Sequence, residues 1–141
     1  ILFINIAVRY IALKSALRRF SAGAKSRGRC IVKGEKCMDA HIKKVYVPMT
    51  ETGFYILLCL RKEAHGYSIV KQVAKLTQGE LKISPGTMYG SLSKMEKDGL
   101  IRFVREEEKR KIYCITDLGT QVLELEMKRI ERLYQTMMEV R

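Results

Sequence analysis

The sequence of 141 residues is poor in glycine and proline and has no long apolar run. Its 10 glycines and 2 prolines are too few for a disordered or low-complexity chain, and no internal repeat is present. No apolar segment reaches about 20 residues, the length that a membrane-spanning helix needs, so no membrane partner is expected. With 47% hydrophobic residues, the chain can hold one small domain with its own core.

Residue patterns typical of enzymes and metal sites are also missing. The sequence shows no nucleophile–base pair, no carboxylate cluster in a polar context and no phosphate-cradling glycine loop, so we expect no enzyme activity and no cofactor. Cys30, Cys37 and His41 form a conceivable metal set, but their spacing fits no common zinc pattern. Cys59 and Cys114 have apolar neighbours and are expected to be reduced thiols near the core of a cytoplasmic protein.

Charge is plentiful and unevenly distributed. The 27 basic and 15 acidic residues give a net charge of +12, which favours a nucleic-acid partner. Residues 1–37 hold nine basic residues and only Glu35 as an acidic one, so +8 of the charge lies there. The other 104 residues carry only +4. The position of individual charges is therefore more informative than their sum.

Residues 1–37 differ in character from the rest of the chain. They begin ILFINIAVRYIALKSALRRF, an apolar and then basic order that is the reverse of a secretory signal. The codons AAA-GGA-GAA would spell Lys33-Gly34-Glu35, and they would contain a bacterial ribosome-binding sequence shortly before Met38. The favoured interpretation is translated upstream sequence. A disordered leader, a transit peptide and a membrane-surface helix remain open.

Three helical segments are expected after Met49. The first spans about 51–63, capped by Thr50, and it is apolar nearly all round, as a central buried helix is. The second lies in HGYSIVKQVAKLTQG, residues 65–79, and glycine is expected to end it. The third begins at Ser84-Pro85, a typical N-cap and first helical position, and ends at Gly99.

The third helix has one ordinary face and one unusual face. Met88, Leu92 and Met95 are spaced for a buried stripe. The other face is rich in small residues, although an interior glycine costs a helix about 1 kcal/mol relative to alanine. Its members are Thr87, Gly90, Ser91 and Ser93, with Tyr89, Lys94 and Lys97 as the large side chains.

The period then changes to that of strands. Residues 101–105 and 111–115 alternate as two strands around a charged tip at 106–110, which predicts a hairpin. A lone hairpin is marginally stable, so this one should pack on the helices. The residues expected to make that contact are Ile101, Phe103, Tyr113 and Ile115.

A final helix is expected from the N-cap Thr116 to about Val140, with two apolar stripes. The first comprises Leu118, Val122 and Leu125. The second has a 4-3-4-3 spacing that predicts a short coiled-coil seam with another chain, and it comprises Leu123, Met127, Ile130, Tyr134 and Met137.

The order helix, helix, helix, hairpin is that of a winged helix-turn-helix, and the motifs carry the similarity further. His65-Gly66-Tyr67, Ser84-Pro85-Gly86-Thr87-Met88-Tyr89, Lys97-Asp98-Gly99-Leu100-Ile101 and Lys111-Ile112-Tyr113-Cys114-Ile115-Thr116 together resemble the PadR-like family of bacterial transcriptional regulators over about residues 49–140. Gly90 and Ser91 depart from the residues common there. Some members stack a ligand on a tryptophan near the dimer interface, and this chain has no tryptophan.

The resemblance implies a mainly α fold with a β-hairpin wing and a C-terminal dimerisation helix. Residues 38–116 would form the DNA-binding domain and residues 117–141 the dimerisation helix. The implied function is a homodimeric repressor of an operator in double-stranded DNA, with room for a small-molecule effector. The alternative is a winged-helix module for protein interaction.

In a helix-turn-helix protein the third helix enters the major groove and the wing contacts the backbone or the minor groove. The expected DNA contacts are His65, Tyr67, Ser84, Pro85, Gly86, Thr87, Tyr89, Ser91, Lys94, Arg105, Lys109, Arg110 and Lys111.

Overall fold

A computed structural model describes residues 40–141 of the chain. The expectations for residues 1–37, including Cys30 and Cys37, lie outside the described residues. Five helices and three strands follow one another in the described part. In chain order they are α2 (Ala40–Tyr46), α3 (Glu51–Cys59), β1 (Ala64–His65), α4 (Gly66–Leu76), α5 (Pro85–Lys97), β2 (Ile101–Glu107), β3 (Arg110–Ile115) and α6 (Asp117–Glu139).

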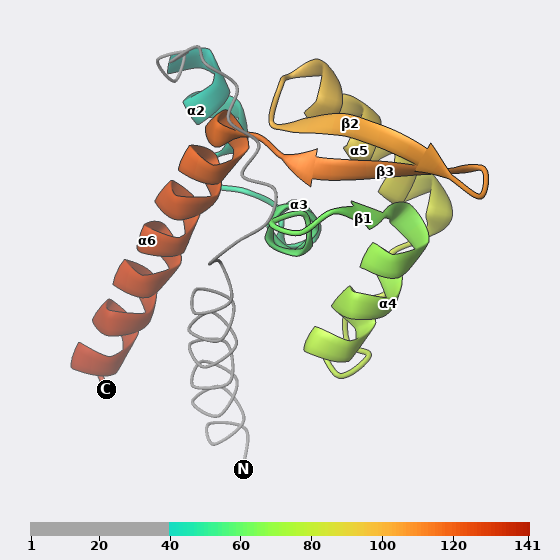
Figure 1. Ribbon diagram of the computed structural model, residues 1–141. Coiled ribbons are helices and arrows are strands. Elements are labelled where there is room, and N and C mark those ends of the chain that lie inside the picture. Colours follow the sequence, from blue (N-terminus) through green and yellow to red (C-terminus); the bar gives the residue numbers. More distant parts are fainter. Residues whose placement is uncertain (1–39) are drawn as a thin grey trace. The chain divides into compact units, whose positions relative to one another are not determined.

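Helix α3 lies at the centre of this fold and packs against α4 and α6 (Figure 1). The Thr50 side chain caps it by accepting a hydrogen bond from Gly53 N at 3.2 Å. Ile56, Leu57 and Leu60 are fully buried, which confirms the central apolar helix. The predicted end at residue 63 is wrong. The helix ends at Cys59, and Leu60 O instead accepts a hydrogen bond from Ile115 N, the last residue of β3, at 2.9 Å.

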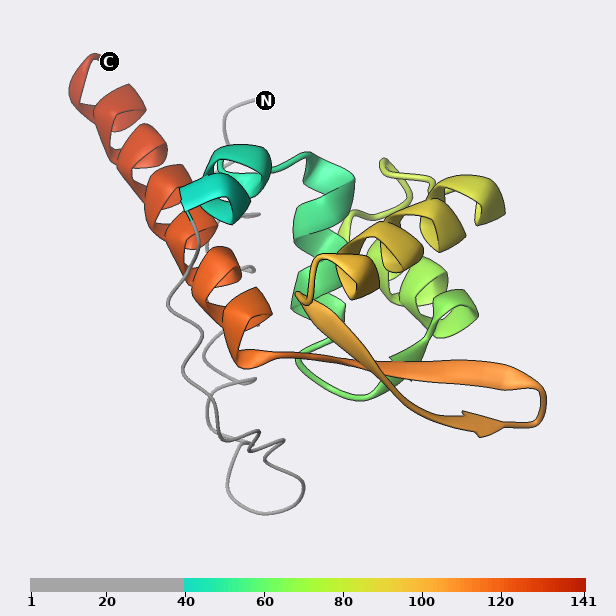
Figure 2. The same ribbon diagram turned by 90° about the horizontal axis from the view of Figure 1, so that it is seen from above.

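The sheet has three antiparallel strands in the order β1-β3-β2. The two-stranded prediction missed β1, a pair of residues in which Ala64 lies opposite Tyr113. The hairpin turn is only Glu108-Lys109, with φ values of +49° and +60°. Two successive positive φ values match the twist of paired strands, so the turn is tight without the usual Asn-Gly. Figure 2 shows the hairpin projecting beyond the helices.

The inner side of the wing differs from the prediction at one residue. Ile101, Tyr113 and Ile115 are buried as expected, but Phe103 is 43% exposed and contacts Tyr113 edge-on. An irregularity between Phe103 and Arg105 shifts the strand register there. Such a bulge re-aims the side chains that follow it. Beyond it, the burial comes from Ile112 on β3, which lies opposite Arg105.

The start of α6 is joined to the turn between α5 and β2. Thr116 caps α6 by accepting from Gly119 N at 3.1 Å, and its hydroxyl donates to Gly99 O at 2.6 Å. A Cβ at Gly119 would overlap Leu100 O and lie 2.8 Å from Ile115 Cγ1. Only glycine fits this close contact between the start of α6 and the segment that follows α5.

The three helices α3, α4 and α5 followed by the β2–β3 hairpin confirm the winged helix-turn-helix prediction.

Candidate nucleic-acid interface

The start of α5 is built as the sequence predicts. Ser84 has an extended backbone, and its Oγ accepts a hydrogen bond from Thr87 N at 3.2 Å and donates one to Thr87 Oγ1 at 2.9 Å. Pro85 occupies the first turn, where its missing N–H has no helical partner to lose. Ser84, Pro85, Gly86 and Thr87 are all exposed. The N-terminal end of α5 thus presents a rigid polar surface.

An outward stripe of three small residues and a lysine runs along α5. The stripe has the spacing i, i+4, i+7 and i+11 and comprises Gly86, Gly90, Ser93 and Lys97, all exposed. It lies opposite Met88, Leu92 and Met95, which are 4% exposed or less. A Cβ at Gly86 or Gly90 would meet nothing within 4 Å. Packing within residues 40–141 therefore does not explain why these two positions lack a side chain.

The DNA contacts expected from the sequence include only some of the residues on this outward face of α5. Ser91, an expected contact, is half-buried on the flank of α5. Gly90, Ser93 and Lys97 face outward but were left out of the expected contacts. Their outward position follows from the buried residues, because two residues turn a helix by about 200°. Gly90 follows Met88 by two residues, and Ser93 and Lys97 lie two residues before and after Met95.

Tyr89 lies beside the stripe and contacts the next helix. Its side chain is 61% exposed, yet a Cβ at Gly66 would come within 3.3 Å of Tyr89 Cε1. One edge of the ring thus rests on the first residue of α4, and the rest faces outward. Tyr89 can therefore pack against α4 and still contact a partner molecule with the outward part of its ring.

His65 and Tyr67 flank Gly66, the first residue of α4. His65 caps the helix because its Nδ1 accepts a hydrogen bond from Ser68 N at 3.2 Å. This bond places the ring proton on Nε2, which leaves a donor for another partner. The His65 and Tyr67 rings are stacked with centroids 6.5 Å apart, and Lys71 Nζ lies 4.6 Å from the Tyr67 centroid. Lys71, which was not expected in the site, adds a cation beside two aromatic rings.

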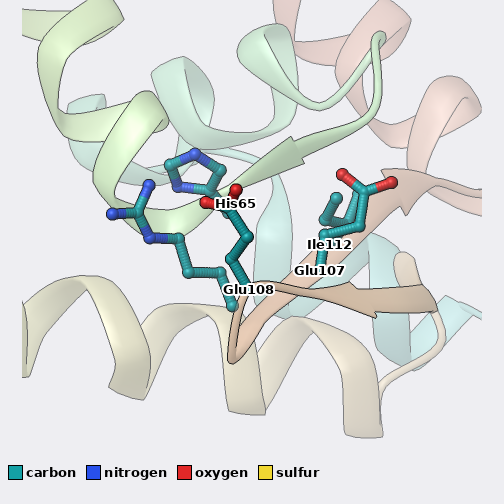
Figure 3. Close-up of a pocket in the computed structure, with 5 residues that line it drawn as sticks. His65, Glu107, Glu108 and Ile112 are labelled. Carbon is teal, nitrogen blue, oxygen red and sulfur yellow. The ribbon is translucent and has the colours of Figure 1, made fainter.

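A groove of about 430 Å³ separates the start of α4 from the tip of the wing (Figure 3). It is lined by His65, Glu107, Glu108, Arg110 and Ile112. Both signs of charge are present, so the groove has no strong preference for an anion or a cation. Among residues 40–141, no group of three or more metal-ligating side chains could hold a metal ion.

The wing cations differ in their partners. Arg105 donates to Glu63 through Nη1 and to Glu107 through Nε at 2.6 Å. These hydrogen bonds, first to Glu63 and then to Glu107, raise the pKa of the guanidinium further above its high ordinary value. Arg105 therefore joins the wing to the segment before β1. The remaining predicted contacts on the wing, Lys109, Arg110 and Lys111, are exposed and have no ion pair within the described part of the chain.

The residues of the predicted seam on α6 differ in their exposure. Leu123 is 2% exposed and belongs to the core of its own chain. Met127, Ile130 and Tyr134 are partly exposed, and Met137 is 42% exposed. The adjacent Leu133 and Met138 are 51% and 47% exposed. The apolar surface of the second half of the helix is therefore available to a partner, whereas Leu123 is not.

Comparison with known proteins gives this arrangement a family. The model of the transcriptional regulator PadR-like family matches residues 56–125, from α3 into α6. The chain belongs to the PadR-like family. A PadR family transcription regulator from Clostridium difficile has 29% sequence identity, and the match covers 64% of this chain and 98% of that one with a TM-score of 0.57. This confirms the family that the motifs indicate.

The similarity to a curated relative covers a smaller part of that protein's length. The transcriptional regulator YqjI of Escherichia coli is 34% identical over 73 residues, which are 52% of this chain and 35% of that protein. The chain thus spans about a third of that relative. A transcriptional regulator from Clostridium thermocellum, at 23% identity, shares the fold over 73% of this chain with a TM-score of 0.56. Among residues 40–141, no helix is long and apolar enough to cross a membrane.

Proposed function

We propose that this PadR-like chain binds operator DNA as a homodimer and represses transcription. The observation that carries the proposal is the stripe of Gly86, Gly90, Ser93 and Lys97 on the recognition helix α5. Gly90, in the interior of the helix, costs α5 about 1 kcal/mol of stability relative to alanine, and no neighbour among residues 40–141 requires a glycine there. The absence of a side chain at Gly86 and Gly90 lets a duplex come close to the helix backbone, as a helix in the major groove must.

The surroundings of the stripe suit the DNA backbone. Lys71 and Lys97 lie on the α4 and α5 sides, and Lys109, Arg110 and Lys111 lie on the wing. Cations at both ends of a groove-reading helix can each contact a phosphate, and such contacts fix the register of the protein on the duplex. Tyr67 and Tyr89 add exposed rings between them.

An electrophoretic titration with the gene's own upstream DNA tests this proposal. We expect one fragment to be retarded specifically, with an affinity that falls steeply with salt. Thr87→Ala or Lys94→Ala should weaken binding to that fragment, and loss of a phosphate contact should lower the salt slope by about one. Gln121→Ala, on the exposed side of α6, serves as the control and should bind as the unchanged protein does. No specific retardation by any upstream fragment would favour a protein-interaction module.

Repression needs a separate measurement. A reporter gene under the upstream region should be silenced by the unchanged chain and relieved by Lys94→Ala. Activation of the reporter by the unchanged chain would contradict the repressor role while leaving DNA binding intact.

Dimerisation is part of the same proposal and rests on the second half of α6. Ile130 and Met137 lie seven residues apart on its exposed apolar side. A charge there would face the partner helix, so Ile130→Asp should yield monomers and lose operator binding. Light scattering checks the mass, and Lys128→Asp, an exposed position off the seam, is the control. A dimeric Ile130→Asp variant would show that the seam is wrongly assigned.

A further inference from the structure

A polar cluster joins α2 to the C-terminal end of the recognition helix. The Tyr46 side chain is buried, with 6% of the residue exposed, and its hydroxyl donates to Asp98 Oδ2 at 2.5 Å. Lys94 Nζ lies 3.7 Å from the same oxygen and 4.9 Å from the centroid of the Tyr46 ring. Tyr46 and Lys94, from different helices, thus hold one carboxylate between them, and that carboxylate lies 52 positions after Tyr46 in the sequence.

The stability of α5 alone does not explain Asp98. Asp98 is the C-cap of α5, and a negative charge at this end opposes the helix dipole. The order Lys94 then Asp98 is also the weaker arrangement of a helical ion pair. The favourable contact that Asp98 makes at this position is the hydrogen bond that it accepts from Tyr46 of α2.

The titration behaviour of Tyr46 agrees with that contact. Burial, the hydrogen bond to Asp98 and the Asp98 charge all raise the pKa of the phenol above its ordinary value. The hydroxyl therefore keeps its proton at all physiological pH values and remains a donor to the carboxylate.

We propose that Tyr46 is a positioning residue for DNA recognition, which together with Asp98 holds the Lys94 ammonium in place on α5. This inference rests on the proposed function. Lys94 remains 59% exposed at its side chain, so the cluster orients the ammonium without covering it. A lysine that is ordered before binding loses less side-chain freedom at a phosphate, which is worth about two- to tenfold in affinity. Helix α2 thereby contributes to recognition through a neighbour.

A double-mutant cycle tests the proposal on the upstream duplex that the unchanged chain retards. Tyr46→Phe removes the hydroxyl and keeps the ring, and we expect about two- to tenfold weaker binding. In a Lys94→Gln background the same change should have no effect, because the group that it positions is gone. Tyr55→Phe, the same chemical change on α3, is the matched control and should bind normally.

Two results would overturn the inference. Equal losses with and without the Lys94→Gln change would show that Tyr46 supports the fold alone, and undiminished binding by Tyr46→Phe would show that it positions nothing. If Tyr46→Phe does not fold, Asp98→Asn replaces it. Asparagine keeps an acceptor and a favourable C-cap but removes the negative charge beside Lys94. We expect Asp98→Asn to weaken binding to the duplex in the same way, and only when Lys94 is present. An unchanged chain that retards no duplex would instead refute the proposed function.

Discussion

Replacing Gly90 by alanine should make the protein more stable and its DNA complex weaker. Gly90 is the sixth of 13 residues in α5, and a Cβ there would meet nothing within 4 Å. The added methyl group needs no rearrangement within the chain, while alanine restricts the unfolded state and favours the helix. The expected gain is about 0.5–1 kcal/mol in the free energy of unfolding. For a domain of this size that raises the melting temperature by about 2–8 °C.

The effect on binding has the opposite sign. The methyl group would stand on the outward stripe, where the duplex approaches the helix backbone in the proposed complex. Inserting a methyl group into a close-packed contact costs about 1–3 kcal/mol, which corresponds to about a 5- to 150-fold loss of affinity. A gain in stability together with a loss of affinity would distinguish this mechanism from unfolding, because a destabilised variant would lose stability and affinity together.

Thermal unfolding followed by circular dichroism gives the first quantity, and electrophoretic titration with the operator fragment gives the second. Gln121→Ala is the control, since it places alanine on an exposed surface of α6, away from the stripe. A Gly90→Ala variant with a raised melting temperature and unchanged affinity would refute the placement of the stripe against DNA. A lowered melting temperature would refute the structural premise that the position is open.

Three further perturbations follow from individual contacts. Glu63→Gln should free Nη1 of Arg105 for a phosphate while Nε keeps its bond to Glu107, giving about two- to fivefold tighter non-specific binding at low salt and a steeper salt dependence by titration. Gly119→Ala should prevent folding, seen as loss of the cooperative melting transition, because its methyl group would overlap Leu100 O. Burial raises the pKa of the Cys59 thiol from 9.0 to about 11. The unfolded chain therefore ionises first as pH rises, and the stability measured by denaturant titration should fall between pH 9 and 11 by up to about 3 kcal/mol.

Each of these has a matched comparison. Glu124→Gln removes an exposed carboxylate from α6 and should change DNA affinity less than Glu63→Gln does. Gly86→Ala adds the same methyl group as Gly119→Ala at an open position and should fold. Cys59→Ala should lack the part of the alkaline loss that is due to this thiol. If a variant and its comparison give the same result in any of these pairs, the contact on which that prediction rests is contradicted.

Features defined by neighbouring residues were predictable from the sequence. The caps Thr50, Ser84 and Thr116 each bind a backbone N–H three residues ahead, so a short window of sequence contains both partners. The buried stripe of α5 was predictable for the same reason, because its spacing repeats within one helix.

Features that depend on distant residues were not predictable. Strand β1 exists because Ala64 and His65 pair with residues nearly 50 positions later, and its two residues carry no strand pattern of their own. The partner of Arg105, Glu63, is 42 residues away, so the sequence presented this arginine as a free cation. The hydrogen bond between Tyr46 and Asp98 was missed likewise, together with helix α2.

These distant pairs change what the basic charge of the chain means for DNA binding. Residues 38–141 carry only +4 of the net +12, and Lys94 and Arg105 already face carboxylates. A cation that stays beside its carboxylate brings less net positive charge to the DNA and therefore frees fewer counterions from it. The salt slope of operator binding should therefore be shallower than the number of phosphate contacts implies. Cations such as Lys109 and Lys111, which have no ion pair among residues 40–141, should account for most of it.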